Sequence, residues 1–322
     1  MTLSRRALLK GALFAGAAAA VTPERAEARE AKVSPDTAVG LLYDSTRCVG
    51  CNGCVIACKD ANDLPWEGLP AELSYKTKNI IQKTSVPGAE AGAPSIQTHV
   101  KRQCMHCVDP PCASACMLGA LHKEGAGKRD MGGEKQGTGI VVWDKALCVG
   151  CRYCQIACPY AIPKFEWFSA NPRIIKCELC HQRADPNATG PESVANPACA
   201  EVCPAEAVVY GRRAELLEDA KQRIAASPDA YNPRIFGESE GGGTGVLYLT
   251  AKGVDFGQLG FPHLPDYSNA FISENVSHAP YLHGLTPLAL YTVAALVVRR
   301  NKSKEEEEPK EAASKADERS PR

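Results

Sequence analysis

The stretch that decides the fold is CVGCRYCQIACP, residues 148–159, which places four cysteines within eleven residues and then a proline. No helix or strand needs so many thiols so close together. Related stretches are CVGCNGCVIACK at 48–59, CMHCVDPPCASACM at 104–117, and a looser pair, CELC at 177–180 with CAEVCP at 199–204. All 16 cysteines of the 322-residue chain fall into these four groups of four. The sequence therefore predicts four tetra-thiolate sites.

Three kinds of chemistry use such groups. Disulfides staple small secreted scaffolds, but 44% of this long chain is apolar and it can bury a core without them. A structural zinc site joins two separated cysteine pairs into one tetrahedron, and C-x2-C-x2-C-x3-C does not divide into two pairs. That run followed by proline is the bacterial ferredoxin spacing, whose fourth cysteine ligates the other cluster of a pair. We predict [4Fe–4S] clusters, with zinc and disulfides as the alternatives.

The four groups are variants of one pattern. The group at 148–158 matches the ferredoxin spacing to the residue, while the first has Lys59 at the proline position. The second stretches its middle gap and has Met117 there, and the fourth stretches one gap further but restores Pro204. Four related motifs in one chain constitute an internal repeat.

The second and third groups flank a glycine-rich stretch, residues 122–139, followed by IVVWD at 140–144. This reads as a loop feeding a β-strand, as between the halves of a two-cluster ferredoxin. Cys116 would then complete the third group's cluster, and Cys158 the second group's. The first and fourth groups are left to pair with each other. Spacing alone leaves open the alternative of first with second and third with fourth.

Several stretches resemble a known family: GLLYDSTRCVGC, KRQCMHCVDPPC, CRYCQIACPY, KCELC, EVCPAEAVVYG, EGGGTGVLYLT and LVVRRN, between about residues 40 and 301. They are similar to the iron–sulfur subunits that include the β subunits of dimethyl sulfoxide reductase and formate dehydrogenase. The cysteine motifs identify the broad family. The cysteine-free C-terminal stretches resemble the HybA-type electron-transfer subunits of membrane-bound nickel–iron hydrogenase-2.

This resemblance implies first-with-fourth and second-with-third pairing. With crossed ligation, four ligand sets are expected: Cys48, Cys51, Cys54 and Cys203 (cluster 1); Cys104, Cys107, Cys112 and Cys158 (cluster 2); Cys116, Cys148, Cys151 and Cys154 (cluster 3); and Cys58, Cys177, Cys180 and Cys199 (cluster 4). The cofactors would be four [4Fe–4S] clusters.

The expected fold is α+β, with two interleaved bacterial-ferredoxin-like units, a C-terminal extension and one transmembrane helix. The expected parts are a signal peptide (1–28), one ferredoxin-like unit (40–60 and 165–212), an inserted second unit (98–164), the extension (213–280), a transmembrane anchor (281–298) and a disordered cytoplasmic tail (299–322). Within them we expect a helix at 213–226 and a strand at 245–250. Residues between Lys59 and His99 show little periodicity and indicate an inserted loop.

The N-terminus reads SRRALLKGALFAGAAAAV, with a twin arginine, Arg5 and Arg6, before a weakly hydrophobic run and AEA at 26–28 for cleavage. This pattern is typical of a twin-arginine export signal. Near the other end, Leu282–Val298 is predominantly apolar, at the short end of what a spanning helix needs. Arg299 and Arg300 follow it, and the positive-inside rule places that side in the cytoplasm. Both signals predict a domain on the periplasmic side of the inner membrane.

The sequence offers no catalytic residue, and its net charge of zero suggests no nucleic-acid partner. The resemblance implies a non-catalytic relay between the small and large subunits of a periplasmic uptake hydrogenase and a quinone-reactive integral membrane subunit. The alternatives are the same relay in a molybdenum oxidoreductase such as formate dehydrogenase, and a zinc-bearing scaffold. Lys59, Arg152 and Lys176 adjoin cysteines, where their charge could raise the cluster potentials, but the default interpretation is that they are solvated surface charges.

Overall fold

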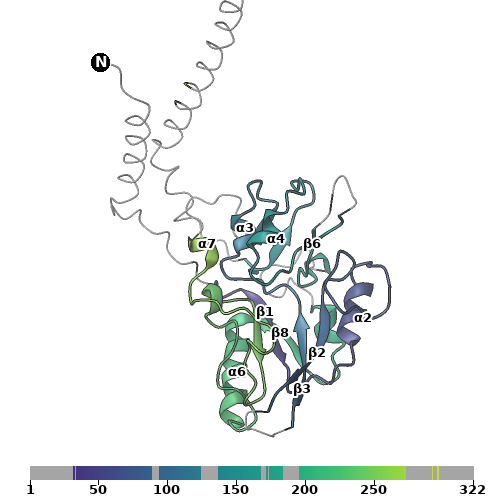
Figure 1. Ribbon diagram of the computed structural model, residues 1–322, viewed down its shortest axis with the longest axis vertical. Coiled ribbons are helices and arrows are strands. Elements are labelled where there is room, and N and C mark those ends of the chain that lie inside the picture. The colour runs from purple at the N-terminus through teal and green to yellow at the C-terminus, as the bar shows by residue number, and fades with distance from the viewer. Residues whose placement is uncertain are drawn as a thin grey trace, which may run out of the picture. The chain divides into compact units, whose positions relative to one another are not determined.

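The structure is a computed structural model (Figure 1) that describes residues 32, 34–88, 94–124, 137–167, 172, 174–183, 196–272, 292 and 296. Residues Glu30–Phe271 make up one compact unit. The predicted signal peptide and tail lie outside the described residues, as does the predicted anchor apart from residues 292 and 296. No helix in the part of the chain that the structure describes is long and apolar enough to cross a membrane.

A three-stranded sheet forms the centre of this unit. Strand β1 (Val39–Asp44) lies between β8 (Val208–Arg212), which runs antiparallel to it, and β9 (Val246–Leu249), which runs parallel. Every residue of β1 is buried because the sheet is covered on both faces. The strand predicted at 245–250 is confirmed by β9.

Helix α6 (Arg213–Ala226) covers one face of the sheet, with the bounds predicted from the sequence. Its buried positions Leu216 and Ala220 are one turn apart and pack against Leu42, Leu247 and Leu249. Burying a side chain such as Leu216 contributes about 1.5–3 kcal/mol. The helix is also tied to β1 by a polar contact, since the buried Asp44 carboxylate accepts a hydrogen bond from Arg223 of α6 at 3.3 Å, and it accepts another from Tyr231, beyond the end of the helix, at 2.9 Å.

The cysteine motifs contribute short helices that pack in pairs. Helix α2 (Gly53–Asp60) of the first motif contacts α5 (Ala198–Glu201) of the fourth. Helix α3 (Pro111–Ser114) of the second motif contacts α4 (Tyr153–Ala157) of the third, and the two lie side by side in Figure 1. The second and third motifs are joined by β4 (Leu121–Lys123) and β5 (Val141–Trp143), which pair antiparallel as the strand–turn–strand interpretation expected.

The expectation of an unstructured loop between Lys59 and His99 was wrong for its second half. Strands β2 (Ile80–Val86) and β3 (Ile96–Arg102) form an antiparallel hairpin there. The central residues of β2, QKTS, are polar, so period-two hydrophobicity is weak and the sequence carries little sign of a strand. Backbone pairing and the burial of Val86 and Val100 hold the hairpin against the core.

The remaining elements are short. They are β6 (Lys164–Phe165) paired with β7 (Ile174–Ile175), the 3-10 turns η1 (His181–Arg183) and η3 (Glu240–Gly242), and α7 (Asn269–Ile272). The C-terminal extension adds aromatic side chains to the core, where Phe236 and Phe261 pack with their ring centroids 4.5 Å apart. The extension is therefore part of the hydrophobic core.

Candidate iron–sulfur sites

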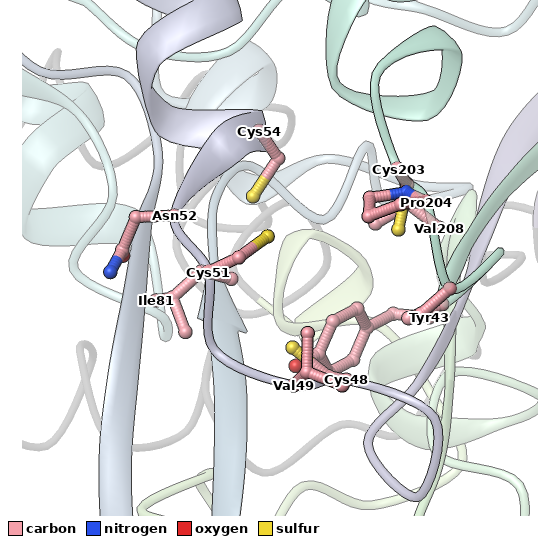
Figure 2. Close-up of a pocket in the computed structure, with 12 residues that line it drawn as sticks. Tyr43, Cys48, Val49, Cys51, Asn52, Cys54, Ile81, Cys203, Pro204 and Val208 are labelled. Carbon is pink, nitrogen blue, oxygen red and sulfur yellow. The ribbon is translucent and has the colours of Figure 1, made fainter.

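Four cysteines from the first and the fourth motif, which are far apart in the sequence, surround one space, called site 1 below. Cys48, Cys51 and Cys54 come from the loop before α2 and its first turn, and Cys203 follows α5. In Figure 2 the sulfurs of Cys51 and Cys54 point toward one another, and Cys48 and Cys203 lie across the same space. The Tyr43 ring from β1 also lines this space, and its hydroxyl donates to the carbonyl oxygen of His99 at 2.8 Å.

Three more sets of four converge in the same crossed manner. Site 2 is lined by Cys104, Cys107, Cys112 and Cys158, and site 3 by Cys116, Cys148, Cys151 and Cys154. In site 4, Cys58 lies close enough to the thiols of Cys177, Cys199 and Cys180 for each to raise its pKa. The structure thus brings together each of the four predicted ligand sets, and each set draws its fourth cysteine from the partner motif.

Left-handed backbone conformations shape each of the four cysteine loops. In the first C-x-x-C segment of each motif the third residue has positive φ: Gly50 (71°), His106 (48°), Gly150 (70°) and Leu179 (49°). Glycine adopts this conformation freely. A Cβ at Gly50 would also lie only 2.3 Å from the imidazole Nε2 of His99. For a non-glycine residue the strain is about 1–3 kcal/mol and persists only where the surroundings impose it. Each of these turns orients the thiols of the two flanking cysteines toward the same site.

The donor chemistry of the sites fits iron–sulfur clusters. The titratable groups lining sites 1 and 3 are the four thiols, with Tyr43 in site 1 and Arg152 in site 3, and no carboxylate or imidazole. No group of three or more Cys, His, Asp or Glu side chains in the described ranges is drawn together tightly enough to hold a single metal ion. A zinc ion needs its sulfur ligands about 2.3 Å from one centre. A cubane instead takes thiolates at separate irons and suits a wider arrangement.

Burial makes several of the free thiols hard to ionise. Desolvation, followed by the charge of neighbouring thiols, raises the pKa of Cys154 to about 12. Burial likewise raises the pKa of Cys199 to about 12 and that of Cys104 to about 11, against the lowering effect of nearby lysines. Cluster ligands are thiolates, so iron must displace these protons, and metal binding is coupled to folding. Within the described residues all sixteen cysteines are free of disulfides.

Thiols of one site affect the pKa of thiols in the next, and these effects connect the sites in the order 1, 4, 2, 3. Burial and the charges of Lys101 and Cys177 have larger effects on the pKa of Cys199 in site 4, and the Cys54 thiol of site 1 raises it further. The Cys177 thiol of site 4 raises the pKa of Cys104 in site 2. The Cys154 thiol of site 3 raises the pKa of Cys112 in site 2. Each site is thus close to the next.

The two sites at the ends of this order are more exposed than the two between them. All four cysteines of site 4 are buried, and site 2 has two buried and two half-buried cysteines. Sites 1 and 3 each have one exposed cysteine, Cys51 and Cys151. Large apolar side chains are exposed around these two sites: Val49, Ile56 and Val202 near site 1, and Met117, Leu118, Leu147, Val149, Tyr153 and Ile156 near site 3. The two terminal sites therefore reach the surface beneath apolar rims.

Both lysines interpreted as surface charges are buried. The Lys59 ammonium donates to the carbonyl oxygens of Pro65 and Lys76, both at 2.9 Å, and so closes the segment after α2. The Lys176 ammonium donates to the carbonyl oxygens of Val141 and Cys177. The interpretation was wrong because a lysine beside a cysteine looks the same in sequence whether its side chain points in or out.

His106 lies between two ligands of site 2, and its ring has a defined tautomer. Its Nδ1 accepts a hydrogen bond from the Val141 amide at 3.1 Å. Burial, followed by the charges of Lys176 and Lys123, holds its pKa well below the usual value. The ring is therefore neutral with its proton on Nε2, which has no protein partner in the described structure. No cysteine is missing from site 2, so His106 is not needed as a ligand.

Comparison with known proteins places the protein in a class. Residues 97–213 match a family model described as a 4Fe–4S dicluster domain. The protein is 33% identical to the iron–sulfur subunit of nitrate-inducible formate dehydrogenase from Escherichia coli, over 66% of its own length and 67% of that protein. It is 32% identical to the B subunit of the anaerobic dimethyl sulfoxide reductase of that organism, over 60% and 82%. The protein is thus an iron–sulfur protein with [4Fe–4S] clusters.

A relative that matches almost the whole chain shows to which family within this class the protein belongs. The chain is 38% identical to the hydrogenase-2 operon protein HybA of Escherichia coli O157:H7, over 93% of this chain and 96% of that protein. The chain belongs to the HybA family, as the C-terminal stretches predicted. The match extends well beyond the cysteine motifs, into the extension that carries α6 and β9.

Proposed function

We propose that the chain is the electron-transfer subunit of a membrane-bound uptake hydrogenase and that it binds four [4Fe–4S] clusters in sites 1–4. The observation that carries the proposal is the arrangement of sixteen thiols as four neighbouring sets, in which sites 1 and 3 each have an exposed cysteine and site 4 is fully buried. When bound, such clusters supply one-electron redox chemistry. The polypeptide contributes the ligands, the order of the sites and the burial of site 4. It has no catalytic role of its own.

The two exposed ends are assigned to two partners. Near the end of the described domain, the Ser268 hydroxyl donates to the Asp109 carbonyl oxygen at 2.9 Å, beside the ligands of site 2, and Ala270 is fully buried. The proposed anchor starts nine residues after Ile272, and nine extended residues span at most about 32 Å. A tether of this length would keep the domain close to the membrane, and we assign the exposed end at site 3 to the membrane side. Site 3 faces the quinone-reactive subunit, and site 1 faces the hydrogenase small and large subunits.

Metal analysis of the purified complex tests this function. We expect about 16 iron and about 16 sulfide ions per chain, since each of four sites holds a four-iron cluster. Zinc in place of iron after anaerobic purification would mean a structural scaffold. Nickel in the co-purified partner supports the hydrogenase assignment. Molybdenum there would transfer the same relay to an enzyme of the formate dehydrogenase kind, which the 33% identity keeps as the second candidate.

Export tests the proposed periplasmic location. Replacing both Arg5 and Arg6 with lysine should leave an uncleaved precursor in the cytoplasm that still contains iron, because the twin-arginine route carries folded, cofactor-loaded proteins. Fractionation, with immunoblotting for the precursor and the mature form, measures this. Arg29→Lys is the matched control, because Arg29 lies after the expected cleavage position and this variant should be exported normally. Normal export of the Arg5 and Arg6 variant would contradict the proposed route.

A further inference from the structure

A buried lysine lies between two of the sites and is not among their ligands. Lys101 is on β3, and its side chain is fully inaccessible to solvent. Its ammonium donates to the side-chain oxygen of Gln103, a neutral group. No carboxylate forms an ion pair with it in the ranges that the structure describes. A fully buried ammonium with a single neutral hydrogen-bond partner is costly unless a nearby negative charge compensates it.

The compensating charges are sulfurs of two sites. Burial by itself lowers the pKa of Lys101, but the Cys199, Cys54, Cys177 and Cys58 thiols outweigh burial and raise it. Cys54 belongs to site 1, and the other three belong to site 4. The effect is mutual, because Lys101 lowers the pKa of each of the four thiols. The geometry agrees, because Lys101 stands directly opposite Ile81 of β2, which lines site 1, and side chains paired in this way share one face of the hairpin. Cys54 of site 1 and Cys58 of site 4 are one turn apart on α2 and lie on one face of that helix. The Lys101 ammonium therefore lies near both sites.

We propose that Lys101 is a shared cation that raises the reduction potentials of the clusters in sites 1 and 4 together. The inference rests on the proposed function, since it requires clusters in both sites. A [4Fe–4S] core with four thiolates is anionic and gains a further negative charge on reduction. A fixed positive charge in a medium of low dielectric stabilises the reduced form more than the oxidised form. Net charge and burial are among the factors that set cluster potentials.

The shared position has a consequence for the relay. Removing the charge from one site alone would open a gap in potential between neighbouring centres. Because one ammonium serves both, the potentials of sites 1 and 4 move in the same direction. Sites 2 and 3 keep their own surroundings, in which the Lys176 ammonium acts on Cys104 and Cys112 of site 2.

The test is a potentiometric titration of the intact complex, monitored by electron paramagnetic resonance. Lys101→Met removes the charge and keeps an unbranched chain of similar length. Lys101→Arg keeps the charge, and Lys83→Met removes an exposed lysine from the paired strand β2 of the same hairpin. The resonance signal that is lost in Cys48→Ala is assigned to site 1, and the signal that is lost in Cys180→Ala is assigned to site 4. We expect K101M to move both potentials to more negative values and leave the other two in place. K101R and K83M should stay close to the wild type.

Other results would overturn the inference. Unchanged potentials in K101M with four clusters present, an equal shift at all four clusters, or the same shift in K83M would each show that Lys101 is not a shared cation. If K101M loses a cluster, K101R decides: retention of that cluster with wild-type potentials supports the role of the charge, and its loss refutes it. Absence of iron from the wild-type complex would refute the proposed function as well, so the two failures are distinguishable.

Discussion

Replacing Cys203 with alanine is expected to abolish the resonance signal of the same cluster that Cys48→Ala abolishes. Alanine provides no ligand atom, and Cys203 lines site 1 with Cys48, Cys51 and Cys54. Loss of a hydrogen-bond partner of a metal ligand costs about 10–100-fold in affinity or activity, so we expect loss of a ligand itself to lower hydrogen-dependent quinone reduction by at least about 100-fold. The measurement is low-temperature spectroscopy of the reduced complex, with quinone reduction assayed on the same sample.

Cys58→Ala is the matched variant for this experiment. Cys58 lies four residues after Cys54, yet its neighbouring thiols are those of Cys177, Cys199 and Cys180. Its loss should remove the site 4 signal and leave that of site 1. If Cys203→Ala instead matched Cys180→Ala, or Cys58→Ala matched Cys48→Ala, ligation would not be crossed between the first and fourth motifs.

The sequence predicted the parts of the fold that local spacing determines. The grouping of the cysteines follows from gaps of two and three residues, and α6 follows from its apolar periodicity. The convergence of α2 with α5, far apart in the sequence, was expected from resemblance to a family, because spacing alone left another pairing open. Structural contacts between these helices place the first and fourth motifs together.

Residues whose role depends on tertiary contacts were not predictable. In HVKRQ, residues 99–103, Val100 and Lys101 are adjacent on β3 and should point to opposite faces, yet both are buried. Val100 packs in the hydrophobic core and Lys101 is fully covered as well, so both faces are buried at this point of the strand, although Gln97 further along it is exposed. Prediction from alternating hydrophobicity assumes that one face of a strand is exposed to solvent, and a lysine is normally placed on that face. The left-handed turn at Leu179 was missed similarly, because leucine rarely adopts it.

The apolar rims at the two ends lead to the last prediction, for which the repeat offers a matched pair. Ile56 and Ile156 each stand two residues after the third cysteine of their motifs, and both are exposed, at 41% and 82%. Each belongs to a different end of the line of sites. Exposed apolar side chains around a terminal site are suited to burial by a partner. A glutamate buried there would be an unpaired charge, costing about 2 kcal/mol or more and weakening association about 30-fold or more.

Ile156→Glu should uncouple the chain from the membrane subunit while hydrogen still reduces its clusters. We therefore expect hydrogen to bleach the visible absorbance of the complex as in the wild type, quinone reduction to fall sharply, and the membrane subunit to be lost on affinity purification. Ile56→Glu should do the reverse, because its rim faces the hydrogenase: the clusters should no longer be reduced by hydrogen, and the membrane subunit should stay bound. An exchange of these two phenotypes would invert the direction of the line of sites. Wild-type behaviour of both variants would show that the rims are not docking surfaces, since a charge cannot be buried at an interface without cost.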